Sequence, residues 1–135
     1  MAIGSNKITP DNPAAFTTQT YVLSALPISQ TNLVVASFRP GFIGQIVSVN
    51  AWARTPNGAA VSQVNIGGSL NVLQAAITPA TGNADPAAGN LLADVTQRRF
   101  TQNQRVTVAV NTGGTAPVDL IVEVVYRAFP LAGEA

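Results

Sequence analysis

The acidic side chains are the first candidates for chemistry in this sequence, because carboxylates can act as general acids, bases or nucleophiles. Asp119 and Glu123 lie four residues apart in a strand-like segment, so they share a face at a backbone spacing of about 13 Å. That spacing is too long for a retaining glycosidase and awkward for an inverting one. It is typical of a solvated strand face. The carboxylates are Asp11, Asp85, Asp94, Asp119, Glu123 and Glu134.

The sequence contains neither cysteine nor histidine. It therefore has no thiol for a disulfide, a zinc thiolate site or a cysteine nucleophile, and it lacks the usual general base and metal ligand. Gly67-Gly68 and Gly113-Gly114 are predicted to be hairpin turns, because neither leads from a strand into a helix with the spacing of a phosphate loop. We expect no catalytic residue, no cofactor and no metal, and therefore no enzyme.

Charged residues make up only 10% of the chain, and the net charge is +1. This balance excludes an electrostatic nucleic-acid binder, which gathers many Lys and Arg on one face. A surface built from Thr, Ser, Asn, Gln and Ala costs little to desolvate and suits large contacts with other subunits. No apolar run approaches the ~20 residues that span a bilayer, so no membrane partner is expected. Residues 1–16 lack the apolar run of a signal peptide, and synthesis in the cytoplasm is expected.

Two groups of side chains inside the domain are candidate interface residues. Arg98 and Arg99, followed by Phe100, offer two cations and a ring; we expect them to pair with acidic groups on a partner subunit rather than with nucleic acid. Trp52 has two interpretations. The first is that its side chain belongs to a second layer of the core. The second is that it anchors an interface, where tryptophan is enriched.

The N-terminal residues 1–16 lack a hydrophobic period and contain Gly4, Pro10 and Pro13. Proline favours extended backbone, so an extended arm is predicted. Such an arm frays in solution or orders along a partner. Its low charge favours the second fate, and its candidate interface residues are Ile3, Lys7, Ile8 and Phe16.

From Thr18 onward the sequence alternates with period two and is rich in Val, Ile and Thr, which predicts strands separated by turns. Val118, Leu120, Val122, Val124 and Tyr126 are expected to face the core. Only residues 70–77 have a helical alternative, 78–90 are expected to form a long loop, and 91–100 to be partly extended. The pattern favours an antiparallel sandwich or barrel. The predicted strands are 20–26, 32–38, 43–54, 61–67, 69–73, 105–111 and 118–127.

Within the strand at 43–54, Gly44 is expected to mark a β-bulge or bend. Val47, Val49 and Ala51 should share one face of this strand. Trp52 lies on the opposite face.

Several segments resemble small jelly-roll proteins of tailed-bacteriophage virions. The segment 38–49 (FRPGFIGQIVSV) resembles their opening strand, 61–68 (VSQVNIGG) the next strand and turn, and 104–108 with 118–126 the last two strands. Where that family often has an acidic Gly-Asp turn, this chain has Gln102-Asn103-Gln104. The resemblance covers about residues 20–127 and implies a capsid decoration (cement) protein.

The expected fold is therefore all-β: a jelly-roll-like antiparallel β-sandwich over residues 17–130, with an extended N-terminal arm (1–16) and a short C-terminal tail (131–135). The resemblance implies that the protein lies on the capsid surface of the virion, binds the major capsid protein and forms a dimer or trimer. Two alternatives remain open. One is a receptor- or glycan-binding module of a tail or fibre, although the loop residues Asn83, Asp85 and Asn90 are not accompanied by Tyr or Trp. The other is a small hydrolase using Asp94, Asp119 or Glu123.

Overall fold

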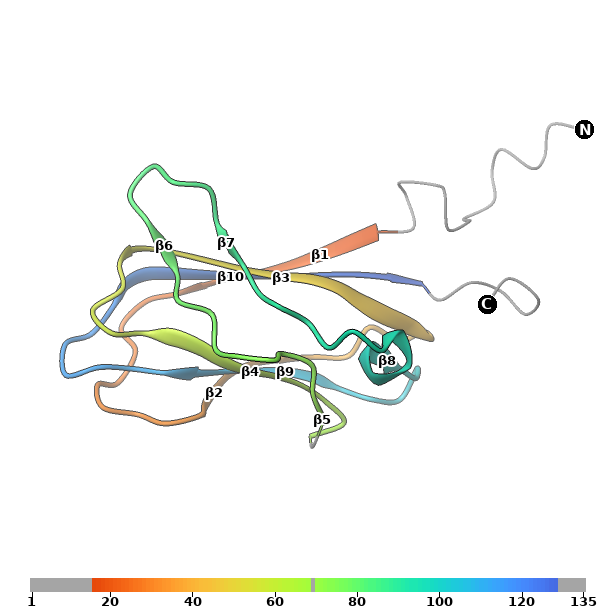
Figure 1. Cartoon of the computed structure of the whole chain (residues 1–135). Coiled ribbons are helices and arrows are strands. Elements are labelled where there is room, and N and C mark those ends of the chain that lie inside the picture. Colours follow the sequence, from red (N-terminus) through yellow and green to blue (C-terminus); the bar gives the residue numbers. More distant parts are fainter. Residues whose placement is uncertain (1–15, 69, 129–135) are drawn as a thin grey trace, which may run out of the picture.

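A computed structural model describes residues 16–68 and 70–128, which form two antiparallel sheets packed face to face (Figure 1). Sheet A has the order β1-β10-β3-β6, with β7 and β8 also pairing with β3, and sheet B has the order β2-β9-β4-β5. The elements are β1 (Phe16–Leu23), β2 (Leu33–Phe38), β3 (Gly44–Thr55), β4 (Ala60–Ile66), β5 (Leu70–Asn71), β6 (Ala80–Thr81), β7 (Ala87–Ala88), the 3₁₀ turn η3 (Val95–Arg98), β8 (Arg99–Phe100), β9 (Val106–Asn111) and β10 (Val118–Ala128).

The strand pairs are nested along the chain. β1 pairs with β10, β2 with β9, β3 with β8, and β4 with β5, all antiparallel. Successive pairs alternate between sheet A and sheet B, which is the wrapping of one long hairpin ribbon into a jelly roll. The expected jelly-roll-like antiparallel sandwich is confirmed. One short parallel pair, β3 with β6, departs from the antiparallel pattern.

The core lies between the sheets and consists largely of valine, leucine and isoleucine side chains. In β10, Leu120, Val122, Val124 and Tyr126 are buried, as the alternation predicts. Val118 is 36% exposed, so its inward assignment was wrong. The next residue, Asp119, has a φ of 52°, which interrupts the extended backbone that strict alternation requires.

The β-bulge of β3 lies at Val47 and not at Gly44. Ile46 pairs with Tyr126 and Ser48 with Val125, which leaves Val47 as the extra residue. The bulge reverses the alternation, so Ile46 is buried in the core and Val47 does not share the face of Val49 and Ala51.

Gly44 has a different role from the expected bulge. A Cβ placed there would lie 2.7 Å from Cζ of the Phe100 ring and would also meet the carbonyl oxygen of Arg127. The missing side chain therefore lets β8 bring Phe100 against the end of β3.

Two less regular segments also differ from expectation. Residues 70–77 contain β5 and an isolated bridge between Ile77 and Val61, and the described part of the chain contains no α-helix. The segment 78–90 contains the short strands β6 and β7, so it is not a structureless loop. None of the helices within residues 16–68 and 70–128 is long and apolar enough to cross a membrane.

The predicted arm and tail lie almost entirely outside the described residues. β1 begins at Phe16, so the last residue assigned to the arm is part of sheet A. Residues 1–15, with Ile3, Lys7 and Ile8, and residues 129–135 are not among those described. Their expected contacts stay predictions.

Candidate functional site

The outer face of sheet A, which points away from sheet B, carries rows of side chains set by the strand register. One row runs from Val22 through Ile121 to Trp52, and the next runs from Thr20 through Glu123 to Asn50. Directly opposed residues in antiparallel strands share a face with Cβ atoms about 5 Å apart. Two apolar side chains and one carboxylate are thereby placed beside Trp52 and Asn50.

A hollow of about 300 Å³ lies over these two rows. Its floor is formed by the strands β3 and β10, through Asn50, Trp52, Ile121 and Glu123. Its wall is formed by Ala84 and Pro86, which belong to the loop between β6 and β7. This loop rises above sheet A in Figure 1. We call this feature the Trp52 hollow.

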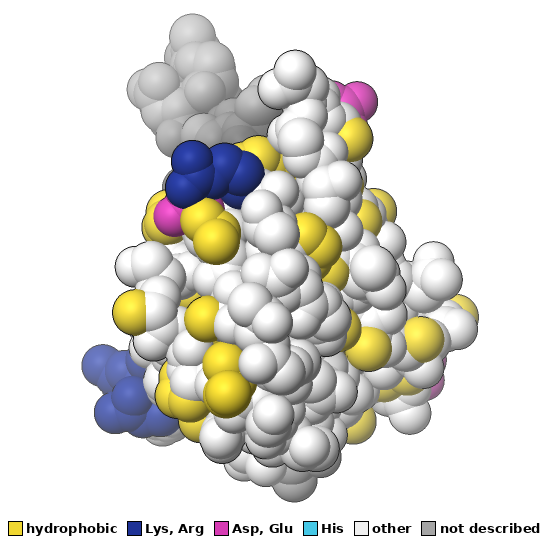
Figure 2. Space-filling view, turned by 90° about the vertical axis from the view of Figure 1, so that its left-hand side faces the viewer, with side chains coloured by type: hydrophobic (Ala, Val, Ile, Leu, Met, Phe, Trp, Pro, Cys, Tyr) yellow, Lys and Arg dark blue, Asp and Glu magenta, His cyan; other side chains and the backbone are white. Residues whose placement is uncertain are grey.

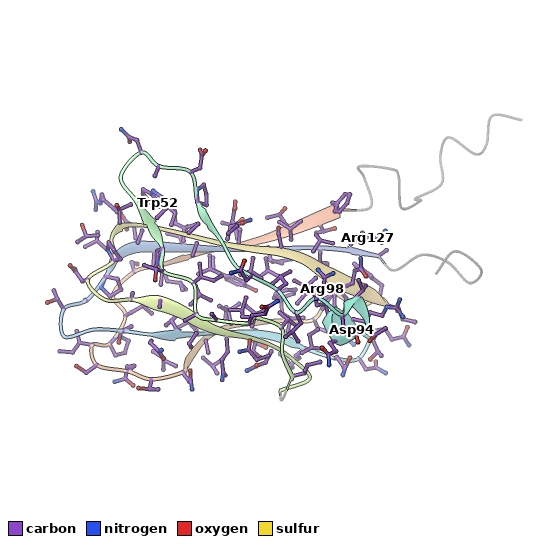
Figure 3. The ribbon with its side chains drawn as sticks, in the orientation of Figure 1. Trp52, Asp94, Arg98 and Arg127 are labelled. Atoms are coloured by element: carbon purple, nitrogen blue, oxygen red, sulfur yellow. The ribbon has the colours of Figure 1, made fainter. Side chains whose placement is uncertain are left out.

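Trp52 is held in place by the loop that forms the wall. Its indole Nε1 donates a hydrogen bond of 2.8 Å to the carbonyl oxygen of Gly82. The same loop is tied to the sheet because Trp52 pairs with Ala80 in the β3–β6 ladder. Trp52 therefore lies outside the core, which makes its interpretation as a second core layer wrong (Figure 3).

The polar side chains of the hollow are free to bind. Within the described ranges, no hydrogen bond or ion pair engages the carboxylate of Glu123 or the side-chain amide of Asn50. The two residues face each other across β10 and β3. A carboxylate offers acceptors only and an amide offers both donors and acceptors, so the pair can bind hydroxyl groups.

Three arginines lie at the opposite end of sheet A. We define Arg98, Arg99 and Arg127 as the arginine end. Arg98 donates from Nη1 to the carbonyl oxygen of Ile46 at 3.3 Å. Arg127 donates from Nε and Nη2 to Gln45 at 3.0 and 3.1 Å when the amide oxygen of Gln45 faces the guanidinium. Arg99 pairs with Gln45 on its other side, through β8. The hydrogen bonds of Arg98 and Arg127 hold these two side chains in place.

Asp94 lies beside the arginine end and caps η3 (Figure 3). Its Oδ1 accepts hydrogen bonds from the Thr96 hydroxyl at 2.7 Å and the Thr96 backbone N–H at 2.9 Å. These bonds lower the pKa of Asp94, and the charge of Arg99 acts in the same direction. The carboxylate is engaged as a cap, and this contact does not suit it to act as a general acid.

The predicted interface residues that lie within the described ranges divide into three groups. Phe16, 46% exposed, lies in the same row as Arg127 and Gln45, so it shares the arginine end with Arg98 and Arg99. Trp52 lies at the other end of the face, about 20 Å away along β3. Phe100 is only 1% exposed and packs in the core, so its assignment to an interface was wrong.

The remaining carboxylates do not form a catalytic or metal-binding cluster in the described parts of the chain. Asp119 is paired with Arg54 at 3.0 Å. No three residues of the types His, Cys, Asp and Glu come together there to hold a metal ion. A second hollow of about 470 Å³, by the β4–β5 turn, is lined by Gly67, Gly68, Asn103, Gln104, Arg105 and Thr107, and offers no carboxylate.

The pattern of the sequence placed Glu123 on an outward position and left Trp52 open between a second core layer and an interface, and it did not bring the two residues together. Their proximity depends on the pairing of β3 with β10, and the wall depends on the pairing of β3 with β6. Comparisons with known protein families, curated proteins and solved structures gave no match. The function has to be inferred from the side chains of this chain.

Proposed function

We propose that this chain is a virion structural protein that decorates or cements the major capsid protein shell of a tailed phage through protein–protein contacts. The observation that carries the proposal is the outer face of sheet B. None of the residues within β2, β4, β5 and β9 is charged. All the charges that lie within strands of the described residues belong to sheet A.

The strand residues of this face are neutral. One row runs from Ser37 through Thr107 to Asn65, and the next from Val34 through Ala109 to Gln63. Neutral hydroxyl and amide groups cost far less to bury than charges do, and they can be satisfied by hydrogen bonds across an interface. The charge at the border of these rows is Arg105, which precedes β9 and donates from Nη1 to the Ser37 hydroxyl at 3.3 Å. A partner protein that covers the face therefore has one cation to satisfy at that border.

The edges of the sheets provide a second means of protein binding. β1 ends sheet A and β2 ends sheet B, and no other described strand pairs with their outer edges. The two edges lie on the same side of the sandwich, because the rings of Tyr21 in β1 and Phe38 in β2 are 6.2 Å apart. Unpaired N–H and C=O groups at an edge can accept a strand from a partner. Repeated over a symmetric shell, such contacts give strong attachment by multivalency.

The proposal is tested first by location. Purified virions labelled with an antibody against this chain should show regular labelling of the head in negative-stain images. Labelling confined to the tail, or its absence from virions, would contradict capsid decoration.

A pair of matched variants then tests the face. Gln63→Glu places a charge in the row of the neutral face that lies farther from Arg105, whereas Thr18→Glu places the same charge on the exposed outer face of sheet A. We expect Gln63→Glu to weaken co-sedimentation with decoration-free shells by at least about tenfold, since an unpaired buried charge costs several kcal/mol. Thr18→Glu should bind as the wild type does. Equal binding by all three proteins would show that sheet B does not form the contact.

The Trp52 hollow favours a second function, recognition of a receptor or glycan by a tail or fibre module. The sequence argued against it, because the loop residues Asn83, Asp85 and Asn90 have no aromatic neighbour in the sequence. In the structure, however, Trp52 contacts Gly82 of the same loop. A ring, a carboxylate and an amide thus border one hollow.

A further inference from the structure

We propose that the Trp52 hollow binds a single neutral pyranose ring. The inference deepens the second function, glycan recognition, and is independent of capsid decoration. It depends on four features of the hollow: its size, the carbon surface of the indole, the free polar groups beside it, and the rigidity of its wall.

The size of the hollow suits one sugar ring. Small-molecule sites begin at about 300 Å³, and the Trp52 hollow has about that volume. It lies on an outer face of the sandwich and not between the sheets, so the rest of a glycan can extend into solvent. The hollow is therefore suited to a terminal residue or to one ring within a chain.

The indole of Trp52 offers its carbon surface to a ligand, because its N–H is already bonded to Gly82. The face of an aromatic ring carries negative charge density, and the C–H face of a pyranose presents weakly positive hydrogens. Stacking the two therefore combines burial of apolar surface with a favourable electrostatic contact. Ile121 and Pro86 border the same space with further apolar surface.

The polar side chains determine which sugars can bind. Glu123 can accept hydrogen bonds from two adjacent hydroxyl groups, and such charge-assisted bonds are among the stronger ones. Asn50, directly opposite on β3, can donate to and accept from a third group. Arg54, a cation on this face of β3, is paired with Asp119. A carboxylate without a cation partner repels anionic sugars, so neutral sugars are preferred.

The wall of the hollow is fixed before a ligand arrives. In addition to the bond from Trp52, the N–H of Ala84 donates to the carbonyl oxygen of Thr81 at 3.2 Å. On the far side of the loop, the N–H of Gly89 donates to the carbonyl oxygen of Val49 at 2.8 Å. A preformed site does not lose binding free energy to the ordering of a loop.

The experiment uses Trp52 as its own reporter, because it is the sole tryptophan of the chain. The full-length protein is titrated with the methyl glycosides of glucose, galactose, mannose and N-acetylglucosamine, and separately with glucuronic acid and N-acetylneuraminic acid, while tryptophan fluorescence is followed. At least one neutral sugar should give a saturable change with a Kd on the order of 1 mM, as expected for a ligand of this size. The anionic sugars should bind at least about tenfold more weakly.

Two matched variants locate the binding. Glu123→Gln should weaken the neutral sugar about tenfold, because it removes the charge from the hydrogen bonds and leaves the shape of the side chain. Asp119→Asn makes the same change on the same face of β10, outside the hollow, and should leave the affinity unchanged. No saturable change with any neutral sugar would overturn the proposal. Equal binding of anionic sugars, or an equal loss in both variants, would overturn it as well.

Discussion

The two ends of the sandwich are closed by different forces. At one end, which we call the aromatic end, the rings of Tyr126, Phe38, Phe42 and Phe100 pack together with centroid distances of 5.5 to 6.0 Å. At the other, the loop end, the loops that follow β1, β3 and β9 are joined by hydrogen bonds between backbone and side chains. Figure 2 looks onto the loop end and shows scattered apolar side chains and a few charged ones on a surface made mostly of backbone and other side chains.

The aromatic end is apolar enough to affect a titratable group. Burial raises the pKa of the Tyr21 phenol, and the neighbouring Tyr126 raises it further. Edge-to-face and offset rings attract one another beyond the area that they bury. The Phe100 and Tyr126 rings meet at 77° in this way.

Thr112 is the centre of the loop end. Its Oγ1 accepts a hydrogen bond from the N–H of Gln30 at 2.9 Å and donates one to the carbonyl oxygen of Pro27 at 2.7 Å. Nearby, the side-chain amide of Asn57 donates to the carbonyl oxygen of Ala116 at 2.9 Å. Directional bonds of this kind fix loop conformation.

The difference between the ends bears on function. The Trp52 hollow lies on the part of β3 nearer the loop end, and its wall is likewise held by directional hydrogen bonds. The arginine end lies over the aromatic cluster, where packing supplies the support. We therefore expect the packing of the aromatic end to contribute most of the difference in stability, and the hydrogen bonds of the loop end to fix the conformation of its loops. Substitutions at Phe100, Thr112 and Asp119, each compared with a second variant, separate these contributions.

Phe100→Ala should have the largest effect. Phe100 is 1% exposed and contacts the rings of Phe42 and Tyr126, so its removal leaves a cavity in the aromatic end. Large-to-small changes of this kind cost about 3–5 kcal/mol. We expect the free energy of unfolding, measured by urea denaturation followed by circular dichroism, to fall by that amount.

Phe16→Ala is the matched control. Phe16 is 46% exposed at the start of β1, and truncation of a surface side chain changes stability by about 0.5 kcal/mol or less. If the two variants lost equal stability, the aromatic end would not be the main source of stability, and the comparison would fail.

Thr112→Val should have an intermediate effect. Valine keeps the shape of threonine but removes the hydroxyl, which leaves the N–H of Gln30 and the carbonyl oxygen of Pro27 without this partner. An unsatisfied buried group costs about 1–3 kcal/mol. The same denaturation measurement on Thr115→Val, at an exposed position of the adjacent turn, should show almost no change.

A smaller loss in Thr112→Val than in Thr115→Val would be incompatible with a loop end held by directional bonds. The effect on the backbone is also measurable by amide hydrogen exchange. The Gln30 N–H should exchange faster in Thr112→Val, while the amides of β8 keep their protection.

The sandwich could be predicted from the sequence because period-two alternation is a local property. The segment 118–127 alternates almost without interruption, and β10 covers Val118–Ala128. The prediction failed where a single residue shifted the alternation between inward and outward side chains. The extra residue Val47 and the positive φ of Asp119 each break the alternation. Neither position is a glycine, so the sequence gives no sign of the break.

The candidate site was less predictable than the fold. Glu123 could be assigned to an outward position and Trp52 to the strand face opposite Val49 and Ala51, but only the order of the strands brings the two into adjacent rows. Phe100 shows the opposite problem. It is the second residue of β8, and a strand of two residues is too short to show an alternation. Its burial also depends on the space that Gly44 leaves free.

Asp119→Asn should have the smallest effect, because it tests a surface ion pair of the loop end. Arg54 Nη2 and Asp119 Oδ2 are 3.0 Å apart, but the side chains are 65% and 41% exposed, so water and salt screen the attraction. Exposed pairs contribute about 0.2–1 kcal/mol, and we expect a loss near the lower limit that disappears in 1 M salt.

Asp119→Ala separates the contribution of the ion pair to stability from that of the backbone conformation. The φ of Asp119 is 52°, a conformation that Asp and Asn tolerate but that costs other L-residues about 1–2 kcal/mol. The alanine variant should therefore lose about 1 kcal/mol more than the asparagine variant, and this extra loss should persist at high salt. If the two variants were equally unstable at low salt and equally rescued by salt, the ion pair would be a main support of the loop end. The neutral hydrogen bonds around Thr112 would then not be what distinguishes it from the aromatic end.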